Sequence, residues 1–70
     1  MIEVDTRGLS CPIPVVNTLQ AINKNPRDEI VVLLNDPIAK ENVLRLAMNK
    51  GYSVSLEDIN DEFRLILKPK

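Results

Sequence analysis

Residues 30–37 read IVVLLNDP, an unbroken aliphatic run followed by a turn signal. Such a β-branched apolar run is typical of a central strand that is at least partly buried on both faces. Asp36 is a favoured N-cap residue, and proline suits the first position of a helix because its missing N–H would have had no intrahelical partner. The stretch therefore predicts a strand that leads directly into a helix beginning at Pro37.

The residues after Pro37 predict a second helix and then a hairpin. Gly51 is well placed to end the helix. The apolar residues of its predicted inner face are Ala39, Val43, Leu46 and Ala47. Residues 52–57 alternate apolar with polar side chains, and after a turn rich in Asp and Asn, Phe63, Leu65 and Leu67 alternate with Arg64, Ile66 and Lys68. This pattern predicts two antiparallel strands.

The segment before residue 30 repeats the strand-then-helix step. Ile2 and Val4 alternate with acidic residues, which predicts a short half-buried strand. A helix is predicted from Pro12 to about Lys24, with an apolar face made of Val15, Val16, Leu19 and Ile22. Pro14 disfavours helical geometry at the residue before it, so this helix is expected to start irregularly or to begin properly only at Pro14.

The predicted order is β-α-β-α-β-β in one domain, residues 1–70. Right-handed βαβ crossovers place both helices on the same face, so we expect an α+β two-layer sandwich with a mixed four-stranded sheet. The predicted core holds Leu19, Ile22, Val32, Leu46, Val54 and Leu65, and Leu46→Ala is expected to cost roughly 2–5 kcal/mol. Val31, Leu33 and Ile66 are expected on the open face, where they either meet another surface or lie under charged side-chain stems.

Composition excludes several classes of site. The single cysteine rules out a disulfide within the chain, and the absence of histidine removes the usual zinc ligands and the base of a Cys-His hydrolase. A net charge of −1 and only two aromatic residues disfavour nucleic-acid binding. With no long apolar run, no leader and a free thiol, we expect a soluble, cytoplasmic protein.

Cys11 lies in the run RGLSCPIP, residues 7–14, directly before two prolines that can lock the start of a helix. A thiol at a helix N-terminus has its anionic form favoured, which would make Cys11 a nucleophile. The alternative is that Cys11 is a small buried apolar residue or only a helix cap. We expect Pro12 and Pro14 to shape this helix start.

The segments that follow the two parallel strands should meet at one edge of the sheet, where α/β proteins tend to bind ligands. Cys11 and Asp36 are then neighbours, with two helix N-termini directed at one region. Arg7 could stabilise a sulfur anion and Lys40 could add positive charge; the alternative for Arg7 is an ordinary exposed arginine, and base rates for surface charges favour a solvated lysine at Lys40.

Residues 5–14, DTRGLSCPIP, resemble the D-x-R-G-L-x-C-P-x-P segment of the TusA/SirA/YedF family of sulfur-carrier proteins. The resemblance extends along nearly the whole chain, through Asn35-Asp36-Pro37 and residues 39–43 and 51–54, and the element order is also that of the family. Residues 39–43, AKENV, and the following Gly51-Tyr52 look most like the YedF branch associated with selenium metabolism, in which a second domain often follows.

The resemblance implies a persulfide carrier of the sulfurtransferase type that needs no cofactor and no metal. Cys11 would accept a sulfane sulfur from a cysteine desulfurase or another carrier and relay it to a protein or to a tRNA-thiolation partner, with Arg7, Pro12, Pro14, Asp36 and Lys40 as supporting residues. Two other hypotheses remain open. One is a non-catalytic regulatory or interaction domain of a larger sulfur- or selenium-metabolism protein, and the other is RNA binding.

Overall fold

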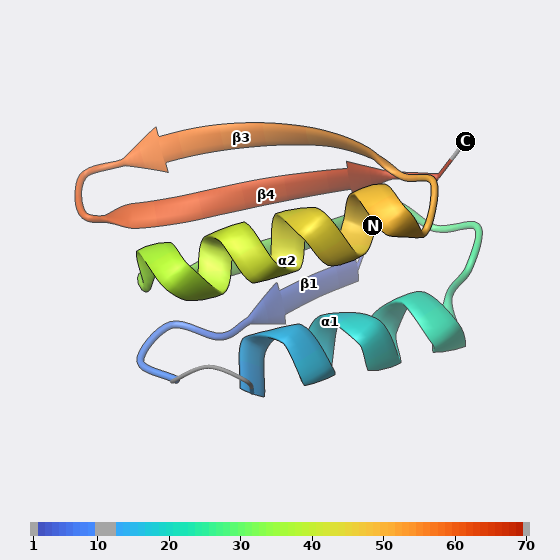
Figure 1. Cartoon of the computed structure of the whole chain (residues 1–70), viewed down its shortest axis with the longest axis horizontal. Coiled ribbons are helices and arrows are strands. Elements are labelled where there is room, and N and C mark those ends of the chain that lie inside the picture. Colours follow the sequence, from blue (N-terminus) through green and yellow to red (C-terminus); the bar gives the residue numbers. More distant parts are fainter. Residues whose placement is uncertain (1, 10–12, 70) are drawn as a thin grey trace.

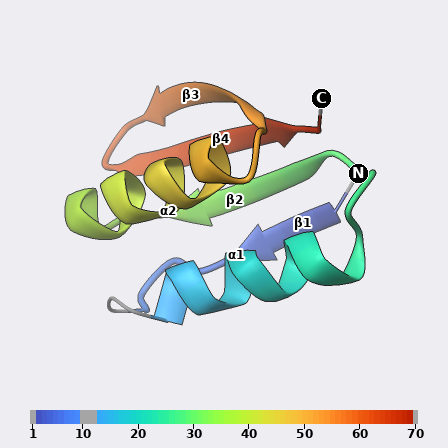
Figure 2. The same ribbon diagram turned by 45° about the vertical axis from the view of Figure 1, so that its right-hand side comes forward.

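Strand β2 (Ile30–Leu34) lies inside a four-stranded sheet of order β1-β2-β4-β3, formed with β1 (Ile2–Asp5), β3 (Ser53–Ile59) and β4 (Glu62–Lys68). The structure is a computed structural model that describes residues 2–9 and 13–69. β1 runs parallel to β2, whereas β4 is antiparallel to both β2 and β3. Helices α1 (Ile13–Lys24) and α2 (Pro37–Asn49) cover the same face of the sheet (Figures 1 and 2). The predicted mixed sheet and two-layer sandwich are confirmed.

Strand register separates a helix-covered face from an open one. Val32 lies between Val4 of β1 and Leu65 of β4, and this row belongs to the core under the helices. The neighbouring row, on the opposite face, consists of Glu3, Val31, Ile66 and Ser55. The period of two along each strand therefore predicted correctly which side chains the helices cover.

Three of the six residues predicted for the core beneath the helices are not fully buried. Ile22, Val32 and Leu65 are buried, but Leu19, Leu46 and Val54 are only half-buried. The buried stripe of α2 consists of Ala39, Val43 and Ala47. Leu46 lies beside this stripe rather than within it, so the cost expected for Leu46→Ala is too high for a side chain that keeps part of its surface in water.

The apolar face of α1 was only partly predicted: Val15 packs against the core and Ile22 is buried, but the rest of the buried face differs. Its buried residues are Pro14, Thr18 and Ile22, spaced four apart, while Val16 is 44% exposed. Thr18 can be buried because its hydroxyl donates a hydrogen bond to the Pro14 carbonyl (2.8 Å). Helical geometry begins at Ile13, one residue before Pro14. The predicted start at Pro12 lies outside the described residues.

The open face carries the expected aliphatic residues, largely covered by their neighbours. Val31 is only 4% exposed, and Leu33 and Ile66 are half-buried. A shallow hollow of about 330 Å³ on this face is lined by Glu3, Val31, Leu33 and Arg64. Aliphatic stems of charged residues thus shield part of the patch, and a docking role for this face stays a prediction.

The opposed leucines of the β3–β4 hairpin give a matched test of this core. Leu65 is 0% exposed and its cross-strand partner Leu56 is 45% exposed. We expect Leu65→Ala to lower the free energy of unfolding by about 2–5 kcal/mol, because it leaves a cavity in the core. Leu56→Ala should cost about 1 kcal/mol or less, because water already reaches the side chain. Urea denaturation of both variants measures the difference, and equal losses would contradict the different burial of these two side chains, which share one face of the sheet.

Candidate functional site

The carboxyl ends of β1 and β2 lie at the same edge of the sheet because the two strands are parallel, with Asp5 opposite Leu33. The chain leaves this edge twice, through residues 6–9 toward α1 and through residues 35–36 into α2 (Figures 1 and 2). The predicted neighbourhood of the two strand-to-helix connections is therefore present. Cys11 and Pro12 themselves lie outside the described residues.

The backbone of residues 6–9 is tied to the sheet at its first residue. Thr6 is fully buried, and both its N–H and its hydroxyl donate to the carbonyl oxygen of Leu33, at 2.7 and 2.8 Å. The Leu9 N–H then donates to the Thr6 carbonyl (3.1 Å), which closes a tight turn over Gly8. Gly8 has φ of +82°, a conformation that glycine adopts without the steric cost of a side chain.

The Arg7 guanidinium is paired with two carboxylates. Its Nε and Nη2 donate to the two carboxylate oxygens of Asp5 at 3.0 and 2.9 Å, and Nη1 lies 3.5 Å from Oε1 of Glu62. Asp5 and Glu62 are on the open face, so the guanidinium reaches the side of the sheet opposite the helices. These hydrogen bonds lower the pKa of Asp5 to about 2 and raise the pKa of Arg7.

This pairing has a consequence for the predicted role of Arg7. A guanidinium already opposed by two carboxylates offers less attraction to a further anion than an unpaired one. The contacts seen here instead fix the start of the loop that leads to Cys11. Support of a sulfur anion by Arg7 stays a prediction.

Asp36 performs the local role that the sequence predicted. Its backbone is extended and its carboxylate oxygen accepts a hydrogen bond from the Ile38 N–H (3.0 Å), which makes it the N-cap of α2. Pro37 occupies the first turn, where no N–H is needed. The start of α2 is therefore firmly placed at the sheet edge.

Lys40 also lies at this edge. Its Nζ is 4.5 Å from the centroid of the Phe63 ring, a cation–π contact, and Phe63 pairs with Leu34 at the end of β2. Lys40 is half-buried, so its charge is held near the site rather than extended into water. Pro14, the remaining supporting residue that the structure describes, is buried at the base of α1.

One contact at the edge involves a residue that the sequence had not singled out for the site. The side-chain oxygen of Asn35 accepts a hydrogen bond from the Gly8 N–H at 3.1 Å. The two residues are 27 positions apart in the chain. The available signal was topological, since both follow parallel strands that end at the same edge, but no local motif marks the pair.

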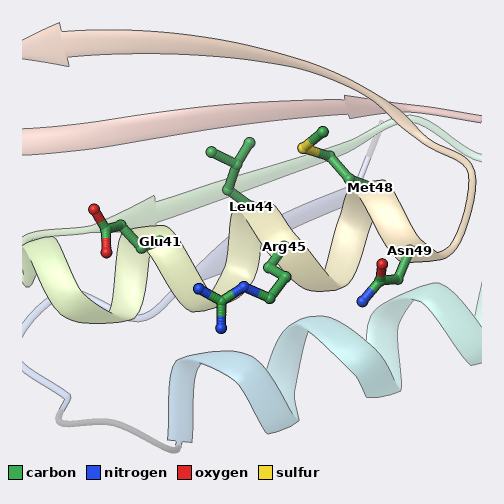
Figure 3. Close-up of a pocket in the computed structure, with 5 residues that line it drawn as sticks. All are labelled: Glu41, Leu44, Arg45, Met48 and Asn49. Carbon is green, nitrogen blue, oxygen red and sulfur yellow. The ribbon is translucent and has the colours of Figure 1, made fainter.

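A separate hollow lies on the outer surface of α2, away from the predicted site. Its volume is about 410 Å³, and it is lined by Glu41, Leu44, Arg45, Met48 and Asn49. Figure 3 shows Arg45 and Asn49 on the side of the helix nearer α1, with Leu44 and Met48 on the other side. None of the predicted site residues that the structure describes lines this hollow. None of the described helices is long and apolar enough to cross a membrane.

Similarity to known proteins covers the whole domain. The family model described as sulfurtransferase TusA matches residues 2–68. A Methanocaldococcus jannaschii protein named "Putative sulfur carrier protein" is 37% identical over 70 residues, which span 97% of this chain and 93% of the relative. A Thermotoga maritima protein with the same description is 30% identical, spanning 96% and 89% of the two chains. The crystal structure of a SirA-like protein from Desulfitobacterium hafniense superposes with a TM-score of 0.87 at 27% identity, covering 100% of both chains.

The Asp5–Arg7 pair predicts a measurable titration. Arg7→Gln should raise the pKa of Asp5 from about 2 toward its ordinary value of 3.8, because the charged hydrogen bonds to the carboxylate are lost. Since the native pKa is depressed, the stabilisation by the pair is complete above the unfolded-state value and is lost as the pH falls through about 2. Carboxyl chemical shifts in an NMR titration report the pKa directly. Glu62→Gln, which removes only the longer contact, should leave Asp5 near 2, and an unchanged Asp5 in Arg7→Gln would contradict the pairing.

Removing the cap of α2 should be costly. Asp36→Ala is expected to lower the free energy of unfolding by about 0.5–2 kcal/mol, because the Ile38 N–H loses its acceptor. Asp36→Ser should retain most of the stability, since serine also caps helices well. Asp61→Ala, an exposed acid in the β3–β4 hairpin, controls for loss of charge alone. Urea denaturation of the three variants would contradict the capping role if Asp36→Ala and Asp61→Ala behaved alike.

Proposed function

The chain belongs to the TusA family of sulfur carriers, and on that premise we propose that it takes up a sulfane sulfur as a persulfide on Cys11 and relays it to a protein partner. The observation that carries the proposal is the family match over residues 2–68 combined with the presence of a single thiol in the sequence. Methionine sulfur cannot form a persulfide, so Cys11 is the one side chain that can hold the cargo by a sulfur–sulfur bond.

The transfer step is a thiol–persulfide exchange. The Cys11 thiolate attacks the outer sulfur of a donor persulfide, a new sulfur–sulfur bond forms on Cys11, and the donor cysteine leaves as a thiolate. The proton of the donor persulfide stays with the transferred sulfur, so no oxidant or reductant is consumed. Delivery repeats the same exchange, with the acceptor thiolate attacking the outer sulfur on Cys11.

The described residues around the site support a protein as donor and acceptor. Ile13 and Ile38, at the starts of the two helices, are 47% and 66% exposed, and Leu9 is also exposed. Exposed aliphatic side chains that flank a reactive residue fit an interface with another protein. The acidic residues Asp5 and Glu62 at the same edge, together with the net charge of −1, disfavour direct contact with a phosphate backbone.

The donor, the acceptor and the branch of the family that we propose follow from the sequence resemblance to the family, and the proposed compartment follows from the free thiol. A donor of the cysteine desulfurase kind and an acceptor in tRNA thiolation are the relay that the family suggests. The AKENV run of residues 39–43 supports the YedF branch, and with it a link to selenium metabolism and a second domain in the parent chain. A reducing cytoplasm is the compartment in which a free thiol carrier would keep its cysteine available.

Mass spectrometry provides the direct test. After incubation with a cysteine desulfurase and cysteine, we expect the intact protein to gain one sulfur atom, and a thiol reductant should remove it. Cys11→Ser should show no gain, because serine cannot form the sulfur–sulfur bond. If several desulfurases and persulfide donors left the wild-type protein unloaded, the carrier role would fail. A Cys11→Ser protein that kept every partner contact and cellular function would favour the non-catalytic interaction domain instead.

A further inference from the structure

Asn35, between β2 and α2, makes a side-chain hydrogen bond that the capping of α2 does not require. It follows β2 directly, and its side-chain oxygen accepts the Gly8 N–H at 3.1 Å. The cap of α2 is the next residue, Asp36, whose carboxylate already serves the Ile38 N–H. Two adjacent polar side chains thus have different tasks: Asp36 starts α2, and Asn35 holds the loop after β1.

In the described part of this loop, residues 6–9, every backbone N–H is hydrogen-bonded within the protein. The N–H of Thr6 donates to the Leu33 carbonyl, that of Arg7 to Asp5, that of Gly8 to Asn35 and that of Leu9 to Thr6. The Arg7 and Leu9 bonds are made to residues two and three positions earlier in the chain, and the Thr6 bond is made to the backbone of β2. Only the Gly8 bond depends on a side chain from the other strand-to-helix connection.

The Gly8 bond lies close to the cysteine along the chain. Gly8 has the left-handed φ of +82°, and Cys11 follows three residues later in the sequence. On the other side of Cys11 in the sequence, Pro14 is buried and its carbonyl accepts the Thr18 hydroxyl. Loss of the Asn35 acceptor therefore removes the hydrogen bond that ties residues 6–9 to the connection before α2, while the contacts of Pro14 on the α1 side are unchanged.

We propose that Asn35 is a positioning residue for Cys11, acting through Gly8 to set how the thiol is presented to a sulfur donor. The functional meaning of this role rests on the proposed carrier function. The positioning itself does not, because any reagent that reacts with the thiol reports it. Since Gly8 and Asn35 are exposed, water can replace the lost bond, and the effect on reactivity should exceed the effect on global stability.

The test compares variants that lose or keep the acceptor. Asn35→Leu is similar in size but cannot accept a hydrogen bond, Asn35→Ser is too short to reach Gly8, and Asn35→Asp keeps an oxygen in place. Asn23→Leu, at an exposed position of α1, is the matched control. The rate of Cys11 alkylation by iodoacetamide is measured from acid to alkaline pH in about 1 M salt, where the Debye length of roughly 3 Å screens the charge added by Asn35→Asp.

We expect Asn35→Leu and Asn35→Ser to change the alkylation rate at neutral pH by about threefold or more, the effect of half a pKa unit on the thiolate fraction. Asn35→Asp and Asn23→Leu should follow the wild-type profile. Amide hydrogen exchange at Gly8 should lose protection in the first two variants and keep it in Asn35→Asp. Thermal melts identify any variant that fails to fold. If either Asn35→Leu or Asn35→Ser does not fold, the alkylation rate of the other one tests the proposal.

Two outcomes would overturn the proposal. In the first, Asn35→Leu and Asn35→Ser lose protection at Gly8 but keep the alkylation profile of the wild-type protein. In the second, the wild-type protein itself is alkylated with the same profile as a free peptide of residues 6–14. The first would show that the bond is only structural, and the second that the fold does not condition the thiol. If instead alkylation responds as expected but persulfide loading fails in the wild-type protein, the carrier function fails and the positioning role stands.

Discussion

The parallel pairing of β1 with β2 is the constraint on which the site depends. It brings two strand-to-helix connections to one edge of the sheet, and Thr6 secures it with two hydrogen bonds to a single Leu33 carbonyl. Thr6 is buried, so these bonds are protected from competition by water. Everything built at this edge, from the Arg7 pair to the cap of α2, starts from the position that this pairing sets.

The two cationic side chains at this edge, Arg7 and Lys40, both interact with other groups of the protein. Arg7 is matched by Asp5 and Glu62 on the open face, while Lys40 lies over the Phe63 ring on the helix side. The two cations are therefore on different sides of the sheet, and only the lysine shares the helix layer in which α1 begins. Of these two residues, Lys40 has the placement better suited to attract an anion near the start of α1.

Sequence patterns predicted features whose cause is local. Asp36-Pro37 carries its capping signal within a few residues, and the Gly51 stop and the strand alternation are equally local, so each was found. The buried face of α1 was only partly predicted, because a threonine can be buried when its hydroxyl donates a hydrogen bond to the preceding turn, as Thr18 does to the Pro14 carbonyl. Hydropathy alone assigns such a residue to the polar side. The Asn35–Gly8 bond joins residues 27 apart and becomes visible only when the strands are paired.

The use of backbone donors limits how the site can stabilise a sulfur anion. Loops that bind anions usually turn several N–H groups toward the ligand. In residues 6–9 every N–H is already bonded within the protein, so this segment offers no donor to an incoming charge without breaking a bond. Pro14 has no N–H, which removes another donor from the first turn of α1. Residues 6–9 thus contribute rigidity, and among the described residues the electrostatic support for the proposed persulfide is left to the helix starts and to Lys40.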